Sequence, residues 1–266
     1  MGGSIQFEKM AGVGQVTICH ASRFNAMSRA MWRELRKVFD SVQSSADLRC
    51  VVIAGDGGNF CSGGDISEYT DFRFHESSLR DFHENDVWGG LQAMLNCDVP
   101  ILARIEGNCM GAGVEIASCC DIRLASDTAK FGAPIAKLGF PMAPREAELV
   151  AREAGLVTAR RMLLEAAIFS ATDMKAAGFL SQVLAPGNLA TETQATASRI
   201  AALAPQAARL NKQTLRAIIG STPPIDSSAL ATDLTANHVA NAYAYADSAE
   251  HREGILAFLQ KRKPAF

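Results

Sequence analysis

Two glycine-rich segments of this 266-residue chain have the residue types to hold a negatively charged oxygen. One, FCSGGDI, covers residues 60–66 after an apolar run that ends at Ala54; the other, GAGVE, covers residues 111–115 after a run that ends at Ile105. Glycine lets a backbone N–H approach a ligand without a Cβ in the way, and the first N–H groups of a helix have no intrahelical acceptor. Two such amides that point at one oxygen would stabilise an oxyanion. The alternative is that these glycines serve only tight turns and close packing.

The pattern of apolar runs and helical segments around the two glycine-rich segments predicts an α/β core. Short apolar runs without alternating polar residues are typical of strands buried on both faces, and strands that alternate with helices at this spacing indicate parallel β-α-β units. The predicted strands cover residues 16–18, 50–54, 101–105 and 121–125, and the predicted helices cover 31–42 and 87–95 and begin again near Gly111. After Pro144 the β-branched runs vanish, so we predict only helices there, over residues 145–154, 157–167, 190–204, 205–218 and 227–245.

The composition excludes several classes of protein. The 26 Lys and Arg residues against 28 Asp and Glu give a formal charge of −2, so there is no basic excess with which to bind nucleic acid. With 48% hydrophobic residues, the chain is not disordered. We expect no membrane contact and a cytoplasmic location, because the sequence has no signal-peptide pattern and no apolar stretch of the roughly 20 residues that a span needs. The seven Cys and five His lack ligand spacing, which predicts buried thiols and no metal.

Several motifs, in order along nearly the whole chain, resemble the crotonase family, which is also called the enoyl-CoA hydratase/isomerase family. The motifs are RFNAM at residues 23–27, VVIAG and NFCSGGDI between 51 and 66, PILA and GNCMGAGVEIA between 100 and 117, FGAP at 131–134, SA and AAGFL between 170 and 180, and REG, AF and KR between 252 and 262. The resemblance implies a crotonase-like β-β-α spiral core over residues 1–200. It also implies a helical C-terminal extension over residues 201–266 that forms a trimerisation region, and hence a homotrimer or homohexamer.

The family resemblance further implies an acyl-CoA substrate and an enzyme of fatty acid metabolism. Family members hold a thioester carbonyl between two backbone N–H groups, which map to Gly64 and Ala112, and stabilise the enolate that forms at the α-carbon. Coenzyme A enters as part of the substrate, and no separate cofactor is expected. The substrate-binding residues implied in this way, with the CoA phosphates near the first and the last, are Arg23, Asn25, Ala26, Cys61, Ser62, Asp65, Ile66, Gly111, Ile135 and Lys261.

Glu115 is the side chain that we expect to move a proton. It matches one of the two glutamates with which the family's hydratases bind and split water, and its apolar neighbours Val114 and Ile116 argue against a surface position. The second glutamate of the hydratases falls at Ile135, which cannot transfer a proton. Weaker candidates for the missing group are Asp65, Glu68, Tyr69 and His83, whereas we place Glu146 and Glu148 on a solvated helix face.

The reaction therefore stays open. Hydration of an enoyl-CoA fits the position of Glu115, while isomerisation of a double bond fits a single carboxylate, because one carboxylate can carry a proton between two carbons. An acyl-CoA hydrolase or decarboxylase that uses the same oxyanion site is a lesser alternative. A hypothesis from a different class is a catalytically silent acyl-CoA-binding protein, which predicts ligand affinity without turnover.

Overall fold

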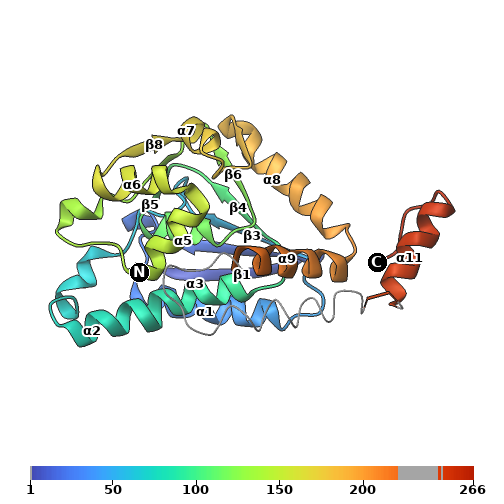
Figure 1. The fold of residues 1–266 in the computed structure, drawn as a ribbon, viewed down its shortest axis with the longest axis horizontal. Helices are drawn as coiled ribbons and strands as arrows, with labels where there is room; N and C mark the ends of the chain where they lie inside the picture. The colour runs from blue at the N-terminus through green and yellow to red at the C-terminus, as the bar shows by residue number, and fades with distance from the viewer. Residues whose placement is uncertain (1, 221–244, 247) are drawn as a thin grey trace.

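A six-stranded sheet forms the centre of the computed structural model, which describes residues 2–220, 245–246 and 248–266 (Figure 1). The strand order is β1-β2-β3-β4-β6-β9. The first two strands form an antiparallel hairpin, and the other neighbours in the sheet run parallel. The strands are β1 Ser4–Met10, β2 Val13–Cys19, β3 Cys50–Gly55, β4 Ile101–Ile105, β6 Ile122–Ser126 and β9 Gln182–Leu184. The predicted α/β core is confirmed.

The sheet is covered by helices on both faces. Successive side chains of a strand point to opposite faces, and in β3 the side chains of Val51 and Ile53 join one apolar cluster while those of Cys50 and Val52 join another. This explains why β3 reads as a continuous apolar run. The helices on the first face include α1 Arg29–Gln43 and α3 Trp88–Asn96, and the second face is covered by α8 Pro186–Ala201 (Figure 1).

A second, three-stranded sheet lies next to the glycine-rich segments. Its strands are β5 Asn108–Met110, β7 Lys130–Gly132 and β8 Ile168–Ser170. The short helix α4 Ala112–Ser118 follows β5 directly and is buried along its whole length. Residue Cys61 pairs with Cys109 of this sheet through an isolated parallel bridge. The first glycine-rich segment is thereby fixed beside the second.

The prediction of helices alone after Pro144 is wrong in two places. The strands β8 and β9 lie in this half of the chain, and each has only three residues, too few to show a period of two against the surrounding helical pattern. The helix predicted over 157–167 ends at Leu164, because Ala166 has a positive φ of 54° that no helix continues. The helices that the structure describes in this half, besides α8, are α5 Pro144–Ala154, α6 Leu156–Leu164, α7 Ala171–Ala176, α9 Pro205–Gly220 and α11 Ala249–Leu259. The helix predicted over 227–245 lies outside the described residues except for its last residue.

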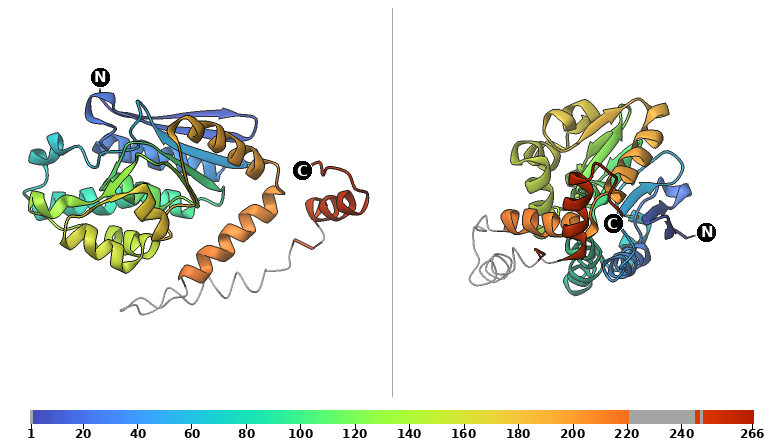
Figure 2. Two further views of the ribbon diagram at one scale, coloured as in Figure 1. Left: turned by 90° about the horizontal axis from the view of Figure 1, so that it is seen from above. Right: turned by 90° about the vertical axis from the view of Figure 1, so that its right-hand side faces the viewer.

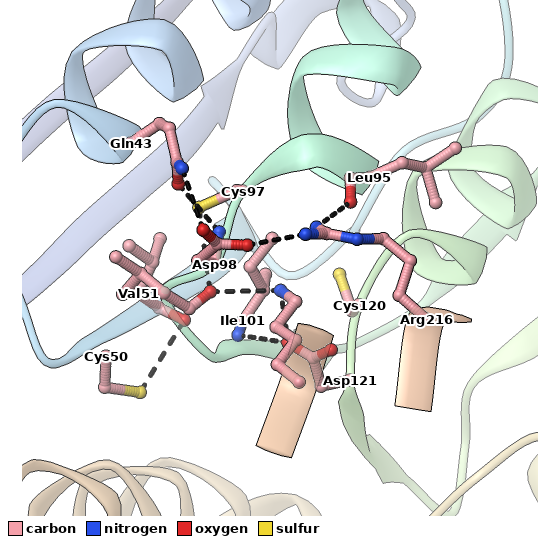
Figure 3. A network of polar contacts seen from close by, with 12 residues as sticks. Gln43, Cys50, Val51, Leu95, Cys97, Asp98, Ile101, Cys120, Asp121 and Arg216 are labelled. Atoms are coloured by element: carbon pink, nitrogen blue, oxygen red, sulfur yellow. Dashed lines mark hydrogen bonds and ion pairs between the residues drawn. The ribbon is translucent and has the colours of Figure 1, made fainter. Parts of the chain in front are cut away.

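Ion pairs attach α9 to the amino ends of the central strands. Lys212 Nζ lies 2.7 Å from Asp121 Oδ2, and Arg216 Nη2 lies 2.6 Å from Asp98 Oδ1. Figure 3 shows Arg216 reaching across to Asp98 and to the carbonyl of Leu95. Beyond α9, the helix α11 lies at one end of the molecule and α2 Glu76–Asp81 at the other (Figure 2). In the described part of the chain, every helix is too short or too polar to cross a membrane.

Candidate active site

A cavity of about 200 Å³ opens beside the two glycine-rich segments. Its wall includes six parts of the chain: residues 62–64, the start of α4, the 3-10 helices η2 Ile66–Asp71 and η4 Pro134–Leu138, the π-helix η3 Phe82–Val87, and α5. The lining residues are Trp32, Ser62, Gly63, Gly64, Ile66, Tyr69, Arg73, Phe82, His83, Val87, Met110, Gly111, Ala112, Glu115, Pro134, Ile135, Leu138, Phe140, Pro141, Met142 and Glu146. The cavity therefore combines an apolar wall with a few charged groups.

Two backbone amides in this wall lack an acceptor. Among the described residues, no hydrogen bond engages the N–H of Gly64 or that of Ala112, although their neighbours Asp65 and Gly111 donate to the carbonyls of Met27 and Gly132. Ala112 is the first residue of α4, where the N–H groups are free and the helix dipole is positive. The two free amides predicted from the sequence therefore lie on the same cavity.

Close backbone approach explains the glycines of this site. A Cβ on Gly113 would come within 2.6 Å of the carbonyl oxygen of Cys61, so a side chain there would push α4 away from residues 61–64. A Cβ on Gly64 would collide with the hydroxyl of Tyr69. Burial raises the pKa of Tyr69 to about 12, so that hydroxyl stays protonated next to Gly64. The wall around the free amides is thus tightly packed.

A pair of buried carboxyl groups lies in the same cavity. Glu115 of α4 is 6% exposed and Glu146 of α5 is 4% exposed. Burial, together with the neighbouring charge of Glu146, raises the pKa of Glu115 well above its ordinary value. Within the described chain no hydrogen bond reaches the Glu115 carboxyl, whereas Glu146 Oε1 lies 2.8 Å from His83 Nδ1. The raised pKa favours the protonated form of Glu115 in the folded protein.

The surface position predicted for Glu146 is wrong, whereas Glu148 is exposed as expected. Glu146 shares the buried face of α5 with Leu149, Val150 and Ala154, at helical spacings of three, four and eight residues. These spacings place Glu146 on the apolar stripe of the helix, so the sequence pattern could have predicted its burial. His83, one of the candidates named from the sequence, lines the cavity from a π-helix, a rare element that is frequent at functional sites.

The predicted substrate-binding residues fall into three groups. Four of them line the cavity: Ser62, Ile66, Gly111 and Ile135. Four are buried and do not line it: Asn25, Ala26, Cys61 and Asp65. Two lie on the exposed surface: Arg23, and Lys261 beyond the end of α11.

The buried group has structural contacts that explain its position. The Asn25 amide donates to the carbonyls of Asp56 and Asn59 at 2.7 Å each, which holds the turn after β3. The Asp65 carboxylate accepts from the backbone and hydroxyl of Ser67 and so caps η2. Burial raises the pKa of the Cys61 thiol to about 12, so it stays protonated. These side chains shape the backbone around the cavity.

All seven cysteines are free thiols, six of them buried, as the sequence predicted. Across the residues that the structure describes, no three His, Cys, Asp or Glu side chains come together as metal ligands would.

Comparisons with known proteins agree along the whole chain. The sequence profile of the family described as enoyl-CoA hydratase/isomerase matches residues 8–266. A protein of Mycobacterium bovis named "Probable enoyl-CoA hydratase" is 30% identical over 99% of this chain and 97% of its own length. A short-chain-enoyl-CoA hydratase of Clostridium acetobutylicum is 28% identical over 98% of this chain and 96% of its own. The crystal structure of an enoyl-CoA hydratase/carnithine racemase from Magnetospirillum magneticum superposes with a TM-score of 0.90 at 32% identity, covering 98% of this chain and 94% of that one.

Proposed function

Because the chain belongs to the enoyl-CoA hydratase/isomerase family, we propose that its cavity binds the acyl group of a CoA thioester. The thioester oxygen accepts hydrogen bonds from the N–H groups of Gly64 and Ala112. Support comes from the two unbonded amides and from the position of Ala112 at a helix start. Each such donor contributes about 3 kcal/mol to stabilising an enolate oxygen. No cofactor beyond the CoA of the substrate enters this chemistry.

The reaction that the site supports best is hydration of a 2-enoyl-CoA by Glu115 and Glu146. The observation that carries this proposal is the pair of buried carboxyl groups in the cavity that also holds the free amides. Glu146 accepts a proton from a water molecule, whose oxygen bonds to the β-carbon. Glu115 then gives its proton to the α-carbon of the enolate, and the thioester carbonyl reforms. Glu146 thus replaces the glutamate whose position Ile135 occupies.

Isomerisation is the second candidate, and Ile135 favours it. This side chain lines the cavity and is packed against the apolar core, where it excludes a water site on that side. With a 3-enoyl-CoA, the same carboxyl pair would remove a proton from the α-carbon and return one to the γ-carbon. The two reactions share the enolate and the two amides, so only the substrate distinguishes them.

Three glutamate variants test the proposal. Glu115→Gln and Glu146→Gln should each lower kcat by about a hundredfold to ten-thousandfold on the better of crotonyl-CoA and a 3-enoyl-CoA, since each removes one proton carrier. Glu148→Gln, on the exposed face of α5, is the matched control and should retain wild-type kcat. A wild-type kcat in both Glu115→Gln and Glu146→Gln would overturn the proposed roles of these two glutamates. A wild-type protein that binds both thioesters and converts neither would be the silent acyl-CoA-binding protein instead.

We also propose a homotrimer or homohexamer assembled through residues 201–266. Exposed apolar side chains on α9 and α11 support this assembly, since an exposed apolar patch is typical of a contact surface. They are Leu215, Ile255, Leu256, Phe258 and Leu259. Sedimentation of the full chain tests the assembly, and a monomer at micromolar concentration would contradict it. Cytoplasmic location remains a prediction.

A further inference from the structure

The guanidinium of Arg73 lines the cavity without a partner of opposite charge. It stacks on two rings of the cavity wall, 3.7 Å from the ring centre of Phe140 and 4.4 Å from that of Tyr69. Among the described residues, no hydrogen bond or ion pair reaches this guanidinium, and burial lowers its pKa from the ordinary value. An arginine stays protonated in such surroundings. The cavity wall therefore carries a positive charge with five unused hydrogen-bond donors.

Other arginines that stack on rings in this protein have an acidic partner. Arg123 lies over Phe179 and has Glu153 at 3.3 Å and the Cys120 carbonyl at 2.8 Å. Arg29, over the ring of Phe72, pairs with Asp86 at 2.6 Å. Arg161, over Phe169, pairs with Glu165 at 2.9 Å. Ring stacking alone is thus not how this chain satisfies a guanidinium.

The nearest acid does not complete the site. Glu146 attracts Arg73 electrostatically, but its carboxylate is hydrogen-bonded to His83 at 2.8 Å and makes no ion pair with Arg73. The other buried carboxyl of the cavity, Glu115, has a pKa raised by burial and by Glu146. Among the described residues, the donors of Arg73 are therefore free to bind a ligand.

Arg73 lies close to the proposed site of the thioester. Tyr69 places its hydroxyl against Gly64, one of the two amides proposed to hold the thioester oxygen, and Arg73 stacks on the ring of the same tyrosine. Arg73 therefore lies about one phenol ring away from the proposed thioester site, in the wall of the same cavity. The stacking on Tyr69 and Phe140 holds the plane of the guanidinium and so reduces the entropy lost when its donors bind.

We propose that Arg73 binds a carboxylate at the far end of the acyl group, so that the substrate is a short-chain dicarboxylic acyl-CoA. The inference rests on the proposed function, because it takes the thioester to lie at Gly64 and Ala112. A carboxylate matches the planar fork of a guanidinium and forms two parallel charge-assisted hydrogen bonds with it. The ion pair would also offset the cost of the half-buried, unpaired cation.

Binding of saturated thioesters tests this proposal without depending on turnover. Calorimetric affinities are measured for two pairs of matched length: succinyl-CoA with butanoyl-CoA, and glutaryl-CoA with pentanoyl-CoA. The wild-type protein should bind the dicarboxylic member of at least one pair about tenfold to hundredfold more tightly, as expected for hydrogen bonds to a charged group. Arg73→Met should lose this preference while it binds the uncharged thioesters with unchanged affinity, which also shows that the variant is folded. Arg73→Lys should retain part of the preference.

A control variant and three contrary outcomes distinguish the assignment of Arg73 from the proposed function. Arg161→Met removes a stacked arginine outside the cavity and should keep the wild-type preference. Equal affinities within both pairs in the wild-type protein would overturn the assignment of Arg73 and leave the proposed function intact. Equal weakening of both members of a pair by Arg73→Met would also overturn it, because Arg73 would then bind the CoA phosphates. Failure of all four thioesters to bind the wild-type protein would overturn the proposed function itself.

Discussion

Two clusters of charge lie at opposite ends of the central strands, and they are built in opposite ways. Asp98 and Asp121 precede β4 and β6, and Arg216 and Lys212 of α9 pair with them. Figure 3 shows the pair of Arg216 and Asp98. The cavity cluster follows the other ends of the strands and contains the unbonded Glu115. In the first cluster each acid has a cation or an amide donor. In the second, a carboxyl, a guanidinium and two amides have no partner among the residues that the structure describes.

The pKa shifts of the two clusters point in opposite directions. Burial opposes ionisation of Asp98, but hydrogen bonds from Gln43, Gln213 and Arg216 outweigh it and lower the pKa of Asp98. Burial and a neighbouring carboxylate raise the pKa of Glu115. The paired cluster stabilises the attachment of α9. The incompletely paired cluster is stabilised only when a ligand arrives, which is typical of a functional site.

The largest expected difference between the two clusters is the effect of a substitution on kcat. Glu115→Gln should lower kcat by about a thousandfold, whereas Asp98→Ala should leave kcat within about twofold of wild type, because only Glu115 lies on the cavity. Steady-state kinetics with the better enoyl-CoA measures both. A loss of kcat in Asp98→Ala comparable to that of Glu115→Gln would show that the amino-end cluster also serves the reaction.

The next largest expected effect is on the free energy of unfolding, and here Asp98→Ala should be the destabilising substitution. Asp98→Ala should lower the free energy of unfolding by about 2 kcal/mol, because it leaves Arg216 and Gln213 without their acceptor. Glu115→Gln should raise it by about 1 kcal/mol, since it removes a buried acid that ionises at a cost. Urea unfolding at neutral pH measures both changes. A destabilised Glu115→Gln would mean that the glutamate has a structural role.

The dependence of stability on pH is a smaller effect with opposite signs in the two clusters. Glu115 has a raised pKa in the folded state, so the folded protein holds its proton longer than the unfolded chain, and stability falls as pH rises between the two pKa values. Asp98 has a lowered pKa, so its contribution is present above the ordinary value and is lost as pH falls through the folded value. Urea unfolding over a pH series should show that Glu115→Gln flattens the first slope and Asp98→Ala the second. Unchanged slopes would contradict the assigned shifts.

The sequence predicted what depends on local patterns. Gly64, Ala112 and Glu115 lie within two short segments that follow buried strands, so their place on one cavity could be anticipated. The strands β8 and β9 could not, because three residues carry no periodicity. The family resemblance predicted that Ile135 occupies the position of the second hydratase glutamate. It did not predict that Glu146 would lie in the cavity with Glu115.

The remaining site residues depend on long-range packing. Glu146 lies 31 residues beyond Glu115 along the chain, and only the helical phase of α5 indicates that it is buried. Tyr69, Arg73 and His83 belong to a polar stretch whose own pattern resembles a surface loop. Phe140, which another part of the chain supplies, covers Tyr69 and Arg73, and Glu146 of α5 lies against His83.

The proposed reaction requires Glu115 and Glu146 to lie so close that the charge of Glu146 raises the pKa of Glu115. Titration of the Glu115 carboxyl by ¹³C NMR, in the wild-type protein and in Glu146→Gln, tests it most directly. We expect a pKa of Glu115 well above the ordinary range in the wild-type protein and a lower pKa in Glu146→Gln, because removal of the neighbouring charge favours ionisation. A Glu115 that titrates in the ordinary range, or with the same pKa in both proteins, would contradict it.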